Sequence, residues 1–296
     1  MVSRMTPKNS AIFLTLSLAL LSACTDGPAK RVNTPTGPLT ATAKNRLVKE
    51  DPASLKRAAA GFERSGQHSA ALNLYLQLSA QYPDDRESAL GIARCLINLG
   101  QRTEGIARLE ALYSADTTDR RARAALIDAY MKDVQIDKAR SLLQPVVEGG
   151  YASLVEKLQY GVLLEVEGQP EQARLIWDEV RATAPKDPRA TRYMAISFAL
   201  DKEYDTSVAL LQSLLDDPET DDMGRETLSY IYALSGQMKA ALAIARSALS
   251  PREVDARTPL LELLPSLSRK EQATGILLDR VSAATIRRLT QPVNPS

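Results

Sequence analysis

The pattern of apolar and polar residues divides the chain into three zones. Residues 11–21 form an apolar run, and residues 25–51 show almost no apolar periodicity. From Pro52 onward, large and small apolar residues recur at helical spacing as far as Leu289. This pattern predicts a short apolar leader, a polar connecting segment and a helical body.

Glycines mark a regular repeat inside the helical zone. Gly66 and Gly100 are 34 residues apart, and twice that interval separates Gly100 from Gly168 and Gly168 from Gly236. The two missing members of the series fall at Val134 and Lys202. When the glycine is numbered as position 15, six 34-residue blocks run without a gap from Pro52 to Asp255.

Other columns of these blocks follow the same period. Position 20 is small in all six blocks: Ala71, Gly105, Ala139, Ala173, Ser207 and Ala241. Position 11 is large in all six: Phe62, Leu96, Tyr130, Leu164, Phe198 and Tyr232. Position 8 is small except at Ile127, and position 24 is mostly bulky, with Trp177 as its largest member. These columns resemble the tetratricopeptide repeat (TPR).

A TPR is a pair of antiparallel helices, A and B, joined by a tight turn. One pair cannot bury its apolar face alone, so neighbouring pairs stack into a superhelix. The sequence therefore predicts an all-α fold, a superhelical TPR solenoid of about six helix-turn-helix repeats over residues 52–255. A generic helical bundle, the alternative, would show apolar periodicity without a 34-residue lattice. Residues 256–289 are expected to form a degenerate repeat or a C-terminal capping helix pair, and residues 290–296 a tail.

Residues 1–23 have the layout of a lipoprotein signal peptide. Arg4 and Lys8 precede the apolar run, which is too short for a permanent membrane span. The run ends in Leu21-Ser22-Ala23-Cys24, which resembles the bacterial lipobox. The resemblance implies that Cys24 is lipidated and becomes the mature N-terminus. An ordinary secretory signal with a chance cysteine is the alternative.

Residues 24–51 are predicted to comprise the lipidated cysteine and a flexible tether, since they are rich in Thr, Pro, Gly and Lys. In enteric bacteria an Asp directly after the cysteine commonly retains a lipoprotein in the inner membrane. Here Thr25 follows Cys24, and Asp26 comes one place later. We therefore expect a lipid anchor in the outer membrane, on its periplasmic face.

Composition and motifs argue against catalysis. Lys plus Arg is 37 and Asp plus Glu is 36, so there is no electrostatic reason to expect nucleic acid as a partner. The only histidine, His68, is expected to be an exposed helix residue, and Cys95 a small buried hydrophobic residue. No sequence motif of a hydrolase, metalloprotease or P-loop is present. We expect no enzyme activity, no metal, no cofactor and no small-molecule substrate.

The remaining candidate is the concave surface of the superhelix, which the A helices line. In the first three repeats its residues are polar: Lys56, Glu63, Arg64, Glu87, Arg94, Asn98, Asp128 and Lys132. In the fourth to sixth repeats they are apolar: Val155, Leu158, Val162, Val166, Ile196, Leu200, Tyr230 and Leu234. The apolar half predicts a groove for an apolar peptide or an amphipathic helix. Alternatively, the C-terminal helices fold back and fill it.

The arrangement as a whole resembles the TadD-type lipoproteins of Flp/Tad pilus assembly. The similarity includes the sixth repeat, residues 230–236 and 240–246, and more specifically the segment Leu249–Ala256 (LSPREVDA). The resemblance implies a pilotin-like factor that helps an outer-membrane secretin to assemble or localise. Its partners would be the secretin or other pilus components, and the membrane through Cys24.

Three other interpretations share the architecture. They are a pilotin of a type IV pilus, a lipoprotein of the β-barrel assembly machinery, and a lipoprotein that activates a peptidoglycan synthase. The β-barrel assembly lipoproteins are typically shorter and have fewer repeats.

Overall fold

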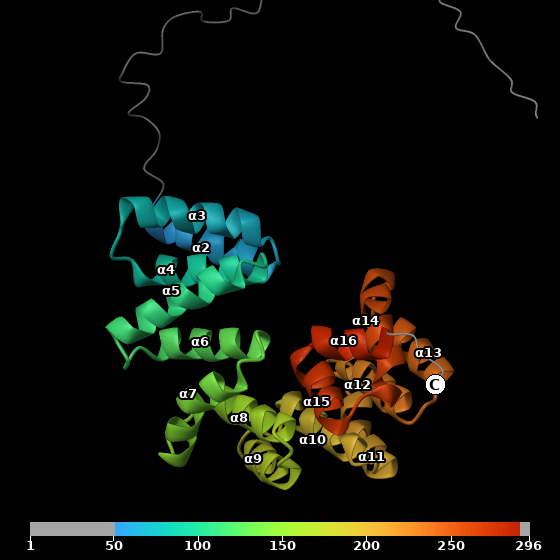
Figure 1. Cartoon of the computed structure of the whole chain (residues 1–296). Coiled ribbons are helices and arrows are strands. Elements are labelled where there is room, and N and C mark those ends of the chain that lie inside the picture. Colours follow the sequence, from blue (N-terminus) through green and yellow to red (C-terminus); the bar gives the residue numbers. More distant parts are fainter. Residues whose placement is uncertain (1–50, 291–296) are drawn as a thin grey trace, which may run out of the picture. The chain divides into compact units, whose positions relative to one another are not determined.

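The computed structural model describes residues 51–290 and is all-helical over that range. Its first twelve helices form six consecutive pairs: α2 (Pro52–Arg64) with α3 (His68–Gln81), α4 (Arg86–Asn98) with α5 (Arg102–Ala115), α6 (Arg120–Lys132) with α7 (Ile136–Glu148), α8 (Leu154–Val166) with α9 (Pro170–Thr183), α10 (Pro188–Leu200) with α11 (Tyr204–Leu215), and α12 (Asp221–Leu234) with α13 (Met238–Ala248). Each pair packs against the next, as Figure 1 shows for α2 to α5. The predicted all-α repeat architecture is confirmed. The signal peptide, Cys24 and the tether up to Glu50 lie outside the described residues, as does the tail from Gln291.

The A helices start at caps that also follow the 34-residue period. The side chains of Asp51, Asp85, Asp119, Ser153 and Asp187 accept hydrogen bonds from backbone N–H groups in the first turn. These bonds satisfy donors that a helix start otherwise leaves unpaired. The sixth residue of this column, Asp221, lies in the first turn of α12, which has no side-chain cap.

The turns between the A and B helices need one residue with positive φ. Glycine occupies that position in four repeats, with φ between 74° at Gly66 and 89° at Gly100. Val134 and Lys202 adopt the same conformation, with φ of 57° and 67°. The turn geometry is therefore kept in the two repeats where glycine is missing, at the cost of backbone strain for a β-branched valine.

The small columns lie where the two helices of a repeat approach each other. All six residues at position 20 are buried, and Ala71, Ala139, Ala173 and Ala241 have no exposed surface. At Gly161, a Cβ atom would lie 2.2 Å from Trp177 Nε1. The indole of Trp177 donates a hydrogen bond to the Leu158 carbonyl at 3.2 Å. Helix α8 thus accepts the largest buried side chain of its partner α9 only because position 8 carries no side chain here.

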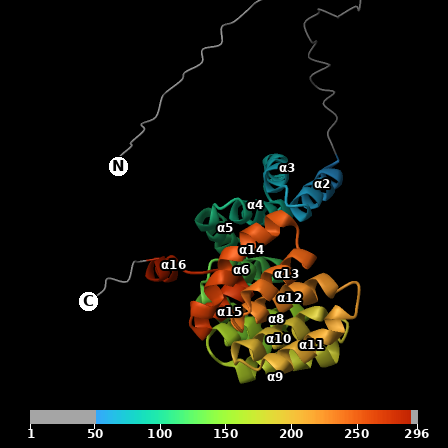
Figure 2. The same cartoon turned by 90° about the vertical axis from the view of Figure 1, so that its right-hand side faces the viewer.

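The C-terminal segment departs from the repeat pattern. Helix α14 (Pro251–Leu263) packs on α13 and α12, and a short 3-10 turn (Leu264–Ser266) follows it. Helix α15 (Arg269–Leu278) then packs on α8 and α10, and α16 (Ala283–Thr290) ends the described chain. Figure 2 shows α15 beside the A helices of the later repeats. The chain therefore returns from its last repeat to its fourth.

Candidate protein-binding surface

The predicted apolar groove residues are almost all buried. Leu158, Val162, Val166, Ile196, Leu200 and Tyr230 are 5% exposed or less, Leu234 is partly buried, and Val155 is 46% exposed. The structure brings Val166, Ile196, Leu200 and Tyr230 into one apolar cluster, whereas Leu158 and Val162 lie in the neighbouring core cluster. We refer to Val166, Ile196, Leu200 and Tyr230 as the apolar A-helix face.

The C-terminal segment covers this face. The same cluster contains Leu260, Leu261 and Leu264 from α14 and the 3-10 turn, and Leu267, Ala273 and Ile276 from in and around α15. The expected open groove is thus occupied by the chain itself, which is the second of the two arrangements considered from the sequence. The physical reason is burial: each square ångström of apolar surface removed from water contributes about 25 cal/mol.

One arginine ties α15 to two repeats. Arg269 Nη2 lies 2.7 Å from Glu165 Oε1 of α8, and Arg269 Nε lies 2.8 Å from Asp201 Oδ1 at the end of α10. Asp201 also pairs with Arg174. Desolvation lowers the pKa of Arg269, but the two carboxylates outweigh it, so the net pKa is raised and the guanidinium stays charged.

A second polar cluster ties α14 to the same surface. Glu226 of α12 pairs with Arg192 at 3.4 Å and with Arg257 of α14 at 3.1 Å. The Arg257 guanidinium also donates to the Tyr230 hydroxyl and lies 5.5 Å from the centre of its ring. Burial raises the pKa of Tyr230 to about 12, so its hydroxyl is protonated at physiological pH.

Sequence reasoning missed Arg269, Glu165 and Asp201. A signal for Glu165 existed, because it is the only charged residue in the apolar stretch from Tyr160 to Val166. A charge in such a stretch is rarely buried without a partner. Nothing in the sequence identified Arg269, which is 104 residues away, as that partner.

In the polar half of the A-helix surface, several charged side chains form ion pairs with one another, most of them between successive repeats. Lys56 pairs with Asp85, and Arg94 Nε lies 2.6 Å from Glu63 Oε1. Asp128 pairs with Lys132 within α6. Arg64, Glu87 and Asn98 are exposed. This half therefore remains accessible in the described structure, but several of its charges already have partners.

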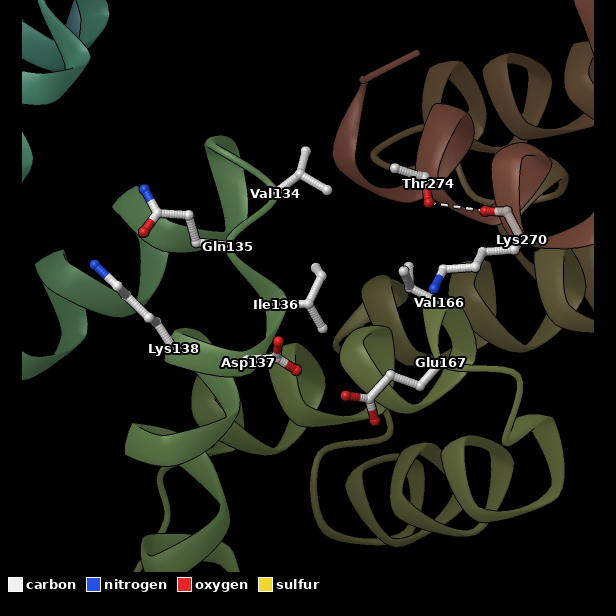
Figure 3. A pocket seen from close by; sticks show the side chains of 9 residues that line it. All are labelled: Val134, Gln135, Ile136, Asp137, Lys138, Val166, Glu167, Lys270 and Thr274. Carbon is white, nitrogen blue, oxygen red and sulfur yellow. Dashed lines mark hydrogen bonds between the residues drawn. The ribbon is translucent and has the colours of Figure 1, made fainter. Parts of the chain in front are cut away.

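Two pockets lie beside α15, one along its flank and one at its C-terminal end. The larger, of about 500 Å³, is lined by Val134, Gln135, Ile136, Asp137, Lys138, Val166, Glu167, Lys270 and Thr274. Figure 3 shows Val134 and Ile136 across this pocket from Lys270 and Thr274. The second, of about 260 Å³, is lined by Ile97, Asn98, Arg102, Lys132, Leu278, Asp279 and Arg280. Open space therefore remains beside Lys270 and Thr274 of α15 and beside its last residue, Leu278.

The reactive side chains stand apart from these pockets. Cys95 is buried, and burial raises the pKa of its thiol to about 11. His68, at the start of α3, is partly buried rather than exposed as expected, and its Nδ1 has no hydrogen-bond partner in the described chain. Within residues 51–290, no three His, Cys, Asp or Glu side chains are grouped so as to hold a metal ion. None of the described helices has both the length and the apolar character needed to cross a bilayer.

Comparisons with known proteins agree with this architecture. Residues 64–112 match the family model of the tetratricopeptide repeat. The crystal structure of a tetratricopeptide repeat protein from Parabacteroides merdae aligns with 75% of this chain and 89% of its own, at 14% identity and a TM-score of 0.62. A thermophilic TPR protein from Thermus thermophilus aligns over its whole length with 72% of this chain, at 20% identity and a TM-score of 0.37. No curated protein sequence matches the chain. The match to the repeat model and the first structural likeness show that the fold is a superhelical TPR solenoid.

Proposed function

We propose that the chain is an outer-membrane-anchored scaffold lipoprotein that binds other proteins, and that it acts as a pilotin-like assembly factor for a Flp/Tad pilus secretin. The observation that carries the proposal is the combination of a lipobox ending at Cys24 with a TPR body. The similarity of Leu249–Ala256 to TadD-type lipoproteins favours the pilus assignment. In this role Cys24 holds the protein at the periplasmic face of the outer membrane, and the solenoid offers surfaces to partners.

The role requires binding and no chemistry of its own. The surface that the A helices line carries accessible charged side chains in its first half, and a pocket lies beside α15; both features suit recognition of a protein segment. We accordingly propose a non-enzymatic protein that needs no cofactor and has neither nucleic acid nor a small molecule as its substrate or partner.

The test is a pull-down of the lipidated protein from its own membranes in mild detergent, with mass spectrometry of the proteins that accompany it. Recovery of a secretin or of other pilus components is the expected result. Recovery of the β-barrel assembly machinery or of a peptidoglycan synthase, with no secretin, would overturn the pilus assignment and leave the anchored scaffold in place.

A further inference from the structure

The contact of α15 with the repeats has the form of a ligand in a binding site. Arg269 reaches two carboxylates from different repeats, 104 and 68 residues away in the chain. Its Nε and Nη2 atoms each serve one carboxylate, which uses the fork geometry of a guanidinium. On the same side of the helix, Ala273 and Ile276 follow at i+4 and i+7 and are buried on the apolar cluster that includes the A-helix face.

The fit is imperfect on its polar side. Glu165 has no exposed side-chain surface, and its Oε2 has no hydrogen-bond partner in the described chain. A buried carboxylate oxygen without a partner is costly, because it has lost water and gained no donor. When α15 leaves, Glu165 loses its arginine but regains water. This exchange lowers the free energy needed to detach the helix.

The fit is imperfect on its apolar side as well. Helix α15 has ten residues, of which Ala273, Gly275 and Ile276 are buried. An isolated helix shorter than about 12 residues is marginal in water, so α15 depends on this small contact. A pocket of about 500 Å³ lies beside its Lys270 and Thr274, and one of about 260 Å³ lies beside Leu278 at its end. A longer helix with bulkier residues at these positions would fill both pockets better.

We propose that α15 is an exchangeable occupant of the part of the apolar A-helix face that α8 and α10 supply, and that this part binds an amphipathic helix of a partner protein in its place. The partner helix carries an arginine one turn before a small residue and two turns before an apolar residue, in the pattern of Arg269, Ala273 and Ile276. Its apolar side chains are bulkier than those of α15. This proposal rests on the protein-binding role proposed above, but it does not depend on which protein is the partner.

The first experiment measures binding of a labelled synthetic peptide, residues 267–281 of this chain, to the full lipidated protein in mild detergent by fluorescence anisotropy. The internal copy competes in the wild type, so we expect weak binding. Arg269→Ala weakens that copy and should tighten peptide binding by about tenfold or more, because a larger fraction of the molecules has an open face. Arg108→Ala is the matched control, since Arg108 forms an exposed ion pair with Glu104 one turn earlier in α5, away from α15.

Peptides with one changed residue test the recognition. Replacing the peptide's arginine by glutamate should abolish binding to the Arg269→Ala protein, and replacing it by lysine should weaken binding. The proposal is overturned if the peptide binds the Arg269→Ala and wild-type proteins equally, or if its arginine makes no difference.

Hydrogen exchange on the wild-type protein provides a test without any variant. We expect the amides of Gln272 to Leu278 to exchange through an opening that leaves α8 and α10 protected. A common exchange free energy for α15, α8 and α10 would show that α15 is a permanent part of the core, and would overturn the proposal.

Peptide binding without a secretin in the pull-down would reject only the pilus assignment, whereas a secretin without peptide binding would reject only the exchange of α15.

Discussion

At the residue scale, the turns of the third and fifth repeats are unusual. Val134 and Lys202 take the left-handed conformation that glycine takes in the other four repeats. For an L-residue this conformation costs roughly 1–2 kcal/mol. Val134 is 38% exposed and lines the larger pocket beside α15, and Lys202 lines another pocket on the opposite flank with Arg269 and Gln272. The two strained residues thus line pockets beside α15.

Replacing Val134 by glycine should increase the free energy of unfolding by about 0.5–1 kcal/mol. The relief of left-handed strain exceeds the extra chain entropy of glycine, which is roughly 0.5–1 kcal/mol. Urea unfolding followed by circular dichroism measures the change. Val155→Gly, in the first turn of α8, is the control and should destabilise the protein. If both variants destabilise equally, the Val134 side chain stabilises the fold through the pocket.

At the scale of the elements, two contacts build the solenoid. Within a repeat, small residues let helices A and B approach, as at Ala173 between α9 and α8. Between repeats, ion pairs join successive A helices, as between Glu63 of α2 and Arg94 of α4. Tyr75 of α3 donates a hydrogen bond to the same glutamate at 3.0 Å. Apolar packing therefore acts both within and between repeats, and charge pairs add contacts between successive A helices.

Ala173→Trp should separate α8 from α9 and destabilise the protein. Ala173 has no exposed surface, and overpacking a core position typically costs about 1–3 kcal/mol or more. Leu175→Trp on the same helix is the matched control, because Leu175 is 68% exposed. Thermal unfolding should show a lower Tm for the first variant and little change for the second. An unchanged Tm for Ala173→Trp would contradict the assigned repeat register.

The Glu63–Arg94 pair should make stability depend on pH. Burial raises the pKa of Glu63, but the Arg94 guanidinium and the Tyr75 hydroxyl outweigh it, so the net pKa lies below its ordinary value of 4.5. A carboxylate with a lowered pKa stabilises the fold above the unfolded-state pKa, and this contribution is lost as pH falls through the folded-state pKa.

Arg94→Met should therefore lower the free energy of unfolding by about 1–3 kcal/mol at pH 7 and by less at pH 3. Urea titrations at the two pH values measure this difference. The exposed pair of Arg108 and Glu104 supplies the control, and Arg108→Met should change stability by less than about 1 kcal/mol at either pH. An equal loss for Arg94→Met at both pH values would mean that the charge pair contributes nothing.

At the scale of the whole molecule, the proposed function needs both the anchor and the repeats. Cys24 lies outside the described residues, so its lipidation rests on the lipobox Leu21-Ser22-Ala23-Cys24. Multiple acyl chains anchor a protein stably, since each buried methylene contributes about 0.8 kcal/mol. The repeats from Pro52 to Ala248 would then meet their partners near the membrane surface.

Cys24→Ser should leave a soluble or uncleaved protein in place of a mature, membrane-bound one. Cell fractionation with mass spectrometry of the N-terminus distinguishes these forms. Cys95→Ser is the control for loss of a thiol and should not change fractionation, because Cys95 is buried in α4. A mature Cys24→Ser protein that still fractionates with the outer membrane would contradict the lipid anchor.

The sequence by itself determined the repeat architecture, because its contacts recur at constant spacing. The turn positions, the small residues at position 20 and the caps of five of the six A helices follow the same 34-residue period. Each repeat makes nearly the same local contacts, so one column in register supports the next. The sequence also showed that the surface lined by the A helices changes from polar to apolar along the chain.

Only the tertiary structure decided what covers the apolar half of that surface. The contact of Arg269 with Glu165 and Asp201 is not repeated from one TPR to the next, so no periodic pattern in the sequence predicts it. It depends on how six stacked repeats bring the end of α8 within reach of a helix that follows the last of them. Such a contact results from the summed rotations between repeats, and therefore local sequence patterns carry no information about it.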